Sequence, residues 1–496
     1  MPRHSFITTV PVKSGSLHRA VKLVAEAGAD INRIHYDRQI DPQTVFWEVT
    51  CDGDAFQRLR TGLKKLGYLR EGLSSVASLK LTVRLPHRTG ALNNFLQSIT
   101  QYGGIITAVA FDDEGSTADT VIISVALEEE EKARALFSTL TAGFHVEDAQ
   151  FNGLEDTSFY VRFVQQLQAY IPHADTATAL DLTVSVNRVA QDLMRLGASP
   201  AQVFQNVLEA ARTIAETSGV GFYADVQTLS LSDTVTLYCV QPPCGGNIYL
   251  FATDDAYTML DTGYGAYYAD VIHLFASLGL DIPAKLTRII LSHGDTDHSG
   301  ASGYYAVPVH MHRTAAETIR ADNRAWGSPK EKVILETVYS KMIATFSRFR
   351  QPEPHLIRFM PEDAAGHRSI FPMIGAVDIG DLRFEVLESL GGHQVGSIFL
   401  YNPEHGYLFT ADSLIYLKGL TPERTRYNKI ADYLMTSVNV SSDTARNERN
   451  ALLEIAADYR KQSGSPCIVF GGHGPFAVEI DGALHAYELP VTRRYP

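Results

Sequence analysis

The sequence predicts a mixed α/β chain in which two small βαββαβ units and a helical segment precede a larger α/β domain. Three observations support this fold class: an internal repeat in the first 150 residues, helical patterns after it, and strands alternating with helices from Phe222 onward. We place the segments at 1–75, 76–152, 153–220 and 221–496. A chain of 496 residues is long enough to hold several separately packed cores.

The first two segments repeat one pattern. Pro11, Gly15 and Leu17 recur as Pro86, Gly90 and Leu92. Each copy has a β-rich run, a turn with glycine, a helix with apolar residues three or four apart, and a second strand after another glycine. "TVFWEVT" and "TVIISVAL" predict third strands, and "DAFQRLRTGLKKL" and "EEEKARALFSTL" predict second helices. This order predicts an antiparallel sheet with helices on one face.

The order of elements and the P-x-x-x-G-x-L turn resemble a tandem pair of ACT domains. The resemblance implies ferredoxin-like modules that often bind amino acids where the first strand meets the first helix. It therefore implies effector sites at Gly15, Ser16 and Leu17 and at Gly90, Ala91 and Leu92. Glycine would let a carboxylate approach the amide groups at a helix start. The alternative is that both glycines only make tight turns in domains that pair with each other.

The third segment reads as three helices without recognisable chemistry. The last of them has Ser199 as its expected cap, Pro200 in its first turn and Gly219 as its stop. We interpret the apolar stripes of these helices as a packing face or an oligomerisation element, and expect a homo-oligomer, either a dimer or a tetramer.

Composition narrows the class of protein. A net charge of -13 argues against a nucleic-acid surface but leaves room for a small anionic substrate held by local arginines. Four scattered cysteines fit neither a disulfide framework nor a zinc cage, and we read them as thiols in a reducing compartment. The sequence shows no apolar run of signal-peptide or membrane-spanning length. We expect a cytoplasmic protein with no membrane partner.

Ligand-type side chains follow several predicted strands of the fourth segment. "LSHGDTDHSG" places His293, Asp295, Asp297 and His298 after the apolar run "TRIILS". Further along the chain, His393 lies on a glycine-rich turn, and Asp412 and His473 each follow a strand. Loops just past buried strands are where α/β folds assemble sites, and histidine and carboxylate are metal ligands. Asp261 stands in the same kind of position upstream.

This ordered set resembles the metallo-β-lactamase superfamily over residues 222–496. The resemblance implies an αββα sandwich with a one- or two-metal site. Carried over, metal 1 takes His293, Asp295 and His393, and metal 2 takes Asp297, His298 and His473. Asp412 bridges the two metals, and Asp261 orients ligands by hydrogen bonds.

The sequence departs from the family signature H-x-H-x-D-H at Asp295. A carboxylate in place of an imidazole favours a harder metal than zinc. The pattern is similar to that of flavodiiron proteins, which carry a glutamate at this place and hold two irons. We therefore expect two metal ions per chain, with iron as the first choice and zinc or manganese as alternatives.

Three functions follow from these residues. The first is a metallohydrolase in which a metal-bridging hydroxide attacks an ester, amide, thioester or phosphoester, regulated by a small ligand such as an amino acid. The second is a di-iron oxidoreductase or O2/NO-binding protein, which would need an external electron donor because no flavin module is recognisable. The third is a non-catalytic ligand sensor. We favour the first, acting on a small-molecule substrate.

A few further residues complete the prediction. Tyr264, Tyr267, Tyr268, Arg424 and Arg426 are possible substrate contacts, although most such residues serve in packing or at the surface. His310 and His312 form an H-x-H in a strand-like segment, and we interpret them as structural. The helix-like segment between His298 and His393 predicts a lid or a dimer surface over the metals.

Overall fold

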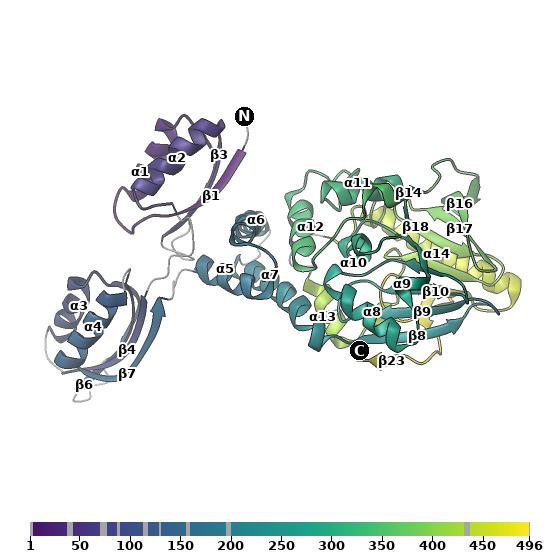
Figure 1. Cartoon of the computed structure of the whole chain (residues 1–496). Helices are drawn as coiled ribbons and strands as arrows, with labels where there is room; N and C mark the ends of the chain where they lie inside the picture. The colour runs from purple at the N-terminus through teal and green to yellow at the C-terminus, as the bar shows by residue number, and fades with distance from the viewer. Residues whose placement is uncertain are drawn as a thin grey trace. The chain divides into compact units, whose positions relative to one another are not determined.

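The computed structural model describes residues 3–36, 43–69, 77–86, 90–112, 118–127, 130–154, 159–194, 200–430 and 437–495. The chain divides into two compact units: Met1–Gln168 with Asp175–Val184, and Ala169–Ala174 with Ser185–Pro496 (Figure 1). Both units contain helices and sheets, so the predicted mixed α/β class is confirmed. In the described ranges, no helix combines the length and apolarity that crossing a membrane requires.

The first copy of the repeat forms a three-stranded antiparallel sheet in the order β1-β3-β2. Its elements are β1 (Arg3–Thr9), α1 (Ser16–Glu26), β2 (Asp30–His35), β3 (Thr44–Thr50) and α2 (Gly53–Lys65). Trp47 and Val49 of β3 share a core with Val24 of α1 and Leu59 of α2. A single bridge joins Leu69 to Thr8 at the edge of the sheet.

The second copy forms a four-stranded antiparallel sheet in the order β5-β6-β4-β7. Its elements are β4 (Ala77–Pro86), α3 (Ala91–Gln101), β5 (Ile105–Asp112), β6 (Ala118–Leu127), α4 (Glu130–Gly143) and β7 (His145–Leu154). Alternate residues of β4 and β6, such as Leu81 and Ile123, pack against Phe95 of α3 and Leu136 of α4. The comparison with ferredoxin-like ACT domains stays a prediction.

Three helices follow: α5 (Phe159–Tyr170), α6 (Thr176–Met194) and α7 (Pro200–Glu216). α7 begins at Pro200, as predicted, whereas its expected cap Ser199 lies outside the described residues. Within the second unit, α7 packs against helices α12 (Ile334–Phe346) and α13 (Pro422–Ile430). The division between the two units runs through α6, and the predicted segment boundaries stay predictions.

The second unit contains two eight-stranded sheets. The first has the order β14-β13-β12-β11-β10-β9-β8-β23 and consists of β8 (Ala224–Ser230), β9 (Thr236–Gln241), β10 (Ile248–Ala252), β11 (Tyr257–Leu260), β12 (Leu286–Ile290), β13 (Val309–Met311), β14 (Ile357–Phe359) and β23 (Thr492–Arg494). The second runs from β15 to β22 in chain order and consists of β15 (Gly366–Arg368), β16 (Phe371–Ile379), β17 (Leu382–Glu388), β18 (Ile398–Asn402), β19 (Tyr407–Ala411), β20 (Ile468–Gly471), β21 (Ala477–Ile480) and β22 (Ala483–Ala486).

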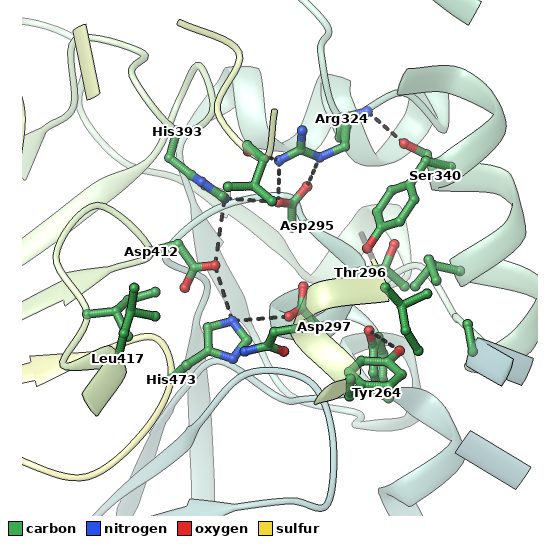
Figure 2. Close-up of a pocket in the computed structure, with 18 residues that line it drawn as sticks. Tyr264, Asp295, Thr296, Asp297, Arg324, Ser340, His393, Asp412, Leu417 and His473 are labelled. Carbon is green, nitrogen blue, oxygen red and sulfur yellow. Dashed lines mark hydrogen bonds and ion pairs between the residues drawn. The ribbon is translucent and has the colours of Figure 1, made fainter. Parts of the chain in front are cut away.

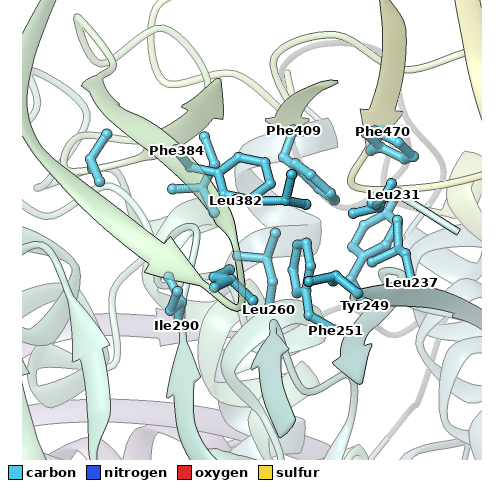
Figure 3. Close-up of a cluster of buried hydrophobic side chains, with 14 of the residues drawn as sticks. Leu231, Leu237, Tyr249, Phe251, Leu260, Ile290, Leu382, Phe384, Phe409 and Phe470 are labelled. Carbon is cyan, nitrogen blue, oxygen red and sulfur yellow. The ribbon is translucent and has the colours of Figure 1, made fainter. Parts of the chain in front are cut away.

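The two sheets pack face to face through aromatic and aliphatic side chains (Figure 3). Phe251 of β10 meets Phe384 of β17 and Phe409 of β19, with ring centroids 5.8 and 5.2 Å apart. Phe409 in turn stacks on Phe470 of β20 at 4.3 Å. Fully burying a side chain of this size contributes about 1.5–3 kcal/mol, so this layer fixes one sheet on the other.

Helices surround the paired sheets (Figure 1). They are α8 (Tyr268–Ser277), α9 (Ile282–Lys285), α10 (Thr296–Ser299), α11 (Arg313–Ala321), α12 (Ile334–Phe346), α13 (Pro422–Ile430) and α14 (Ser442–Ser463). Leu452 and Ile455 of α14 pack on Phe399 and Leu408 of the second sheet, on the face away from the core. Short 3-10 turns are η1 (Gly219–Gly221), η2 (Gly265–Tyr267), η3 (Ser302–Tyr304), η4 (Pro354–Leu356) and η5 (Leu417–Gly419).

Candidate metal centre

The first sheet supplies four ligand-type side chains from one turn. β12 ends at Ile290, and His293, Asp295, Asp297 and His298 follow, the last two on α10. His293 and His298 are fully buried. Upstream, Asp261 follows β11 in a left-handed conformation (φ 58°), which is uncommon for a residue with a side chain and marks a constrained strand end.

The second sheet supplies the other three. His393 lies between β17 and β18, Asp412 follows β19, and His473 follows β20. Glu448 of α14 holds the loop before His393, because its carboxylate accepts hydrogen bonds from the Ser389 hydroxyl (2.6 Å) and the Leu390 amide (2.5 Å). The seven side chains that the sequence predicts as ligands therefore come from both sheets.

Asp412 stands between the histidines of both predicted metal positions. Its Oδ1 lies 3.2 Å from Nε2 of His298, and its Oδ2 lies 3.2 Å from Nε2 of His473 and 3.7 Å from Nε2 of His393. Figure 2 shows its carboxylate between His393 and His473. This is the position expected of a carboxylate that bridges two cations.

Two groups of side chains bring their ligand atoms within 4.8 Å of one another: His293, Asp295 and His393, and Asp297, His298 and His473. These are the two sets predicted for metals 1 and 2. A third group joins Asp261 to His293 and His298. The role of each residue as a ligand stays a prediction.

Several buried polar atoms of the centre have no hydrogen-bond partner among the described residues. They are Nε2 of His293, and Nε2 of His298 and Oδ1 of Asp412, which lie 3.2 Å apart without forming a hydrogen bond. Buried polar atoms without partners are rare in proteins and call for an explanation. Because all three face the same cluster of imidazoles and carboxylates, the donor set fits a bound cation.

Three of the histidines have their other ring nitrogen fixed by a neighbour. Nδ1 of His293 lies 2.9 Å from the Ser292 hydroxyl, Nδ1 of His298 lies 3.0 Å from Oδ2 of Asp261, and Nδ1 of His393 lies 3.3 Å from the Asn439 side chain. Asp261 also accepts hydrogen bonds from the amide and hydroxyl of Ser292, both at 2.7 Å. Such contacts orient metal-binding imidazoles in proteins, and this role of Asp261 stays a prediction.

Sequence reasoning missed the arginine beside Asp295. Arg324 donates to both oxygens of Asp295, from Nε (3.2 Å) and Nη2 (3.1 Å), and Gln394 donates to Oδ1 at 2.8 Å. Nη1 of Arg324 donates to Glu336 of α12 (3.1 Å), and Nη2 also donates to the Val438 carbonyl (2.6 Å). Arg324 and Glu336 are only 5% and 1% exposed. The carboxylates of Asp295, which is largely buried, and of Glu336, which is fully buried, therefore share the guanidinium of Arg324.

The pKa values of His293 and Asp295 both fall below their ordinary values, for different physical reasons. Burial lowers the pKa of His293 to about 4, so this imidazole is neutral and able to bind a cation. Burial alone would raise the pKa of Asp295, but the guanidinium of Arg324 outweighs it and holds the pKa well below the usual range. Asp295 is therefore a carboxylate at neutral pH.

A cavity of about 200 Å³ opens beside the cluster. Of the predicted substrate contacts, only Tyr264 lines this cavity among the described residues. The structure does not support the prediction that the other four residues contact a substrate. Tyr267 hydrogen-bonds to Cys244 and Thr217, and Tyr268 stacks on Tyr304. Arg426 is exposed.

Arg424 has a structural role instead. Its guanidinium donates to Asp225 and to the carbonyls of Gln241 and Pro242, which fastens α13 to the first sheet. His312 accepts a hydrogen bond from the Thr314 amide at the start of α11 and lies 3.2 Å from Glu388. This agrees with the structural interpretation of His312, and His310 lies on β13.

The predicted effector residues lie in the first unit. Gly15 and Gly90 precede α1 and α3 in the same left-handed conformation, with φ of 79° and 88°. Ser16 and Ala91 are buried at the first position of each helix, and Leu17 and Leu92 are half-buried. The two copies thus repeat one local geometry at the predicted positions.

Gly472 leaves no room for a side chain, and this leads to the first prediction. A Cβ at this position would lie 2.0 Å from Oδ1 of Asp412 and 2.9 Å from the His298 ring. Gly472→Ala should therefore displace Asp412 and lower metal affinity by at least about tenfold. Calorimetric titration with metal would measure this, with Gly53→Ala, where φ is not positive and a Cβ meets nothing within 4 Å, as the control. Equal affinity in both variants would contradict the role of Asp412.

Known proteins are similar to part of this chain. Solved structures similar to this chain include BLEG-1 B3 metallo-beta-lactamase (17% identity, covering 48% of this chain and 92% of that chain, TM-score 0.29) and a metallo-beta-lactamase from Pontibacter korlensis (14%, 51%, 94% and 0.30). No curated protein matches the sequence. The family model of the metallo-beta-lactamase superfamily matches residues 241–450, a range that includes the 293–298 turn, His393 and Asp412. The chain thus contains a metallo-beta-lactamase superfamily domain at residues 241–450.

Proposed function

We propose that the second unit is a dinuclear metal-dependent hydrolase. The observation that carries this proposal is the convergence of four histidines and three aspartates from both sheets beside a cavity. The unpartnered atoms of His293, His298 and Asp412 support it, since a cation would satisfy all of them. The substrate is a small molecule with an ester, amide, thioester or phosphoester bond.

The chain's own residues prepare the site for this reaction. Two metal ions held here would supply a water of near-neutral pKa and polarise the substrate carbonyl or phosphoryl oxygen. Ser292, Asp261 and Asn439 aim three imidazoles into the cluster. Arg324 and Gln394 hold Asp295 from the opposite side. The adjacent cavity would orient the substrate and limit the access of bulk water.

Metal analysis of the purified full chain tests this proposal. We expect two metal ions per chain, and hydrolysis of a generic ester or phosphodiester that a chelator abolishes and added metal restores. A metal-loaded protein that cleaves none of these bonds would refute the hydrolase function.

A di-iron oxidoreductase or O2/NO-binding protein is the second candidate, and Asp295 favours it. A third carboxylate replaces an imidazole nitrogen with a hard oxygen ligand, and this change favours iron over zinc. Such chemistry would need an external electron donor. Two irons with a visible absorption band that bleaches on reduction would favour this function, whereas a colourless zinc or manganese protein would remove it.

We further propose that the first unit binds an amino-acid effector at Gly15, Ser16 and Leu17 and at Gly90, Ala91 and Leu92. A non-catalytic sensor would use the same residues. The Ser16 hydroxyl is buried without a hydrogen-bond partner among the described residues, and a bound carboxylate would supply one. Cytoplasmic location and a dimeric or tetrameric assembly remain part of the same proposal.

The effector site gives the second prediction. Calorimetry of the full chain against the twenty amino acids should detect one that binds. Gly15→Ala with Gly90→Ala should weaken this binding by at least about tenfold, because a methyl group would then obstruct the helix starts. Gly28→Ala, a left-handed glycine that follows α1, is the control for backbone strain alone. No heat with any amino acid would dismiss ligand binding there.

A further inference from the structure

The cavity beside the metal centre has two chemically different ends. Asp295, Asp297, His393, Asp412 and His473 form one end (Figure 2). Tyrosine and aliphatic side chains of α12 and α13 form most of the other, together with the polar side chains of Ser340 and Asn428. A substrate placed for reaction at the first end must therefore extend its unreactive part along the second.

Tyrosine rings line the apolar end of the cavity, and the hydroxyl groups of two of them hydrogen-bond to each other. The hydroxyls of Tyr264 and Tyr427 hydrogen-bond to each other at 3.0 Å, so these residues offer mainly their rings to a ligand. Tyr339 and Ile343 of α12 also line the cavity, and Leu417 lies on the side of Asp412 and His473 (Figure 2). Planar or aliphatic groups pack well against such a surface.

The described lining residues of the cavity include no arginine or lysine that is free to pair with an anionic group of a substrate. Arg324 is the one arginine or lysine among its described lining residues. All three of its nitrogen atoms donate to protein acceptors, namely Asp295, Glu336 and the Val438 carbonyl. A carboxylate at the apolar end would therefore meet no free opposite charge among the described lining residues, and burying a charge without one is costly.

The volume limits the size of the group. A cavity of roughly 150 Å³ accepts a benzene ring in another protein. Drug-sized ligands occupy about 300–1,000 Å³. At about 200 Å³, this cavity suits a single ring or a short acyl chain rather than a nucleotide or a peptide.

We propose that the substrate is a small ester, thioester or amide whose unreactive part is uncharged and apolar. This inference rests on the proposed hydrolase function and narrows it. Substrates with a second anionic group away from the reacting bond are excluded from the class, because no free arginine or lysine among the described lining residues would meet that group.

Matched esters test the inference on the metal-loaded full chain. 4-Nitrophenyl butyrate and 4-nitrophenyl hemisuccinate share a leaving group and differ by a carboxylate on the acyl chain. We expect kcat/KM for the butyrate to exceed that for the hemisuccinate by at least about tenfold. Equal rates, or preference for the hemisuccinate, would overturn the inference while leaving the hydrolase function intact. Hydrolysis of neither ester with metal bound would instead overturn the hydrolase function, and the inference with it.

The variant Leu417→Lys tests whether an added positive charge lets the cavity accept an anionic substrate. Leu417 lines the cavity and is 65% exposed, so a lysine there can be accommodated without burying its charge. We expect this variant to raise kcat/KM for the hemisuccinate by about tenfold relative to the butyrate. Val220→Lys, at an exposed position that does not line the cavity, is the control and should leave the ratio unchanged. An unchanged ratio in Leu417→Lys, with metal content equal to that of the wild type, would overturn the inference.

Discussion

Asp412→Asn is expected to remove metal binding at both positions and to lower kcat/KM by at least about a thousandfold. The carboxylate of Asp412 lies within 3.7 Å of imidazoles from both predicted metal sets. An amide keeps the shape of the side chain but loses the negative charge that would face two cations. Metal content after dialysis and hydrolysis of 4-nitrophenyl butyrate would measure the two effects.

Asp443→Asn is the matched control for this variant. Asp443 lies in the first turn of α14 with its side chain 90% exposed, and it should keep full metal content and activity. Two tightly bound ions in Asp412→Asn would show that Asp412 is not a bridging ligand. Circular dichroism would establish that the variant is folded.

Arg324→Met is expected to lower the free energy of unfolding of the metal-free protein by about 3–5 kcal/mol. Arg324 pairs with Asp295 and Glu336, and both carboxylates are largely buried. Removing the guanidinium leaves two negative charges without a partner in a medium of low polarity. Denaturant unfolding followed by fluorescence would measure the loss.

Two further variants separate charge from packing. Arg324→Met combined with Glu336→Gln should recover part of the loss, because the second change removes one of the unpaired charges. Arg313→Met breaks the exposed ion pair with Glu362, and it should cost less than about 1 kcal/mol. If Arg324→Met were no more destabilising than Arg313→Met, the buried pairs would contribute little to stability.

Much of the second unit could be predicted because its strands are short apolar runs followed by glycine or polar residues. "LTRIILS" and "GYLFTADS" each mark a buried strand and the residue that leaves it, so the positions of His293 and Asp412 followed from local pattern alone. The pairing of strands and the division of the chain through α6 depend on contacts distant in sequence. No local periodicity encodes such contacts.

The environment of the centre was harder to predict than its ligands. Arg324 belongs to no motif, and it reaches Asp295 only because α11 and α12 fold back over the 293–298 turn. One signal was present: Glu336 interrupts the apolar helix "VILETVYSKMIATF", and a carboxylate on a buried face requires a cationic partner. Tyr339 and Tyr427 gave no signal, because packing and cavity tyrosines have the same sequence pattern.

The separate origin of the donors from the two sheets bears on how the protein is made. A nascent chain that ends after β14 holds the donors of the 293–298 turn but none of His393, Asp412 and His473. Tight capture of ions must then await synthesis of β20 and docking of the second sheet through Phe409 and Phe470. Tight metal binding would thus accompany the completion of folding, and a partly synthesised chain would have low affinity for metal.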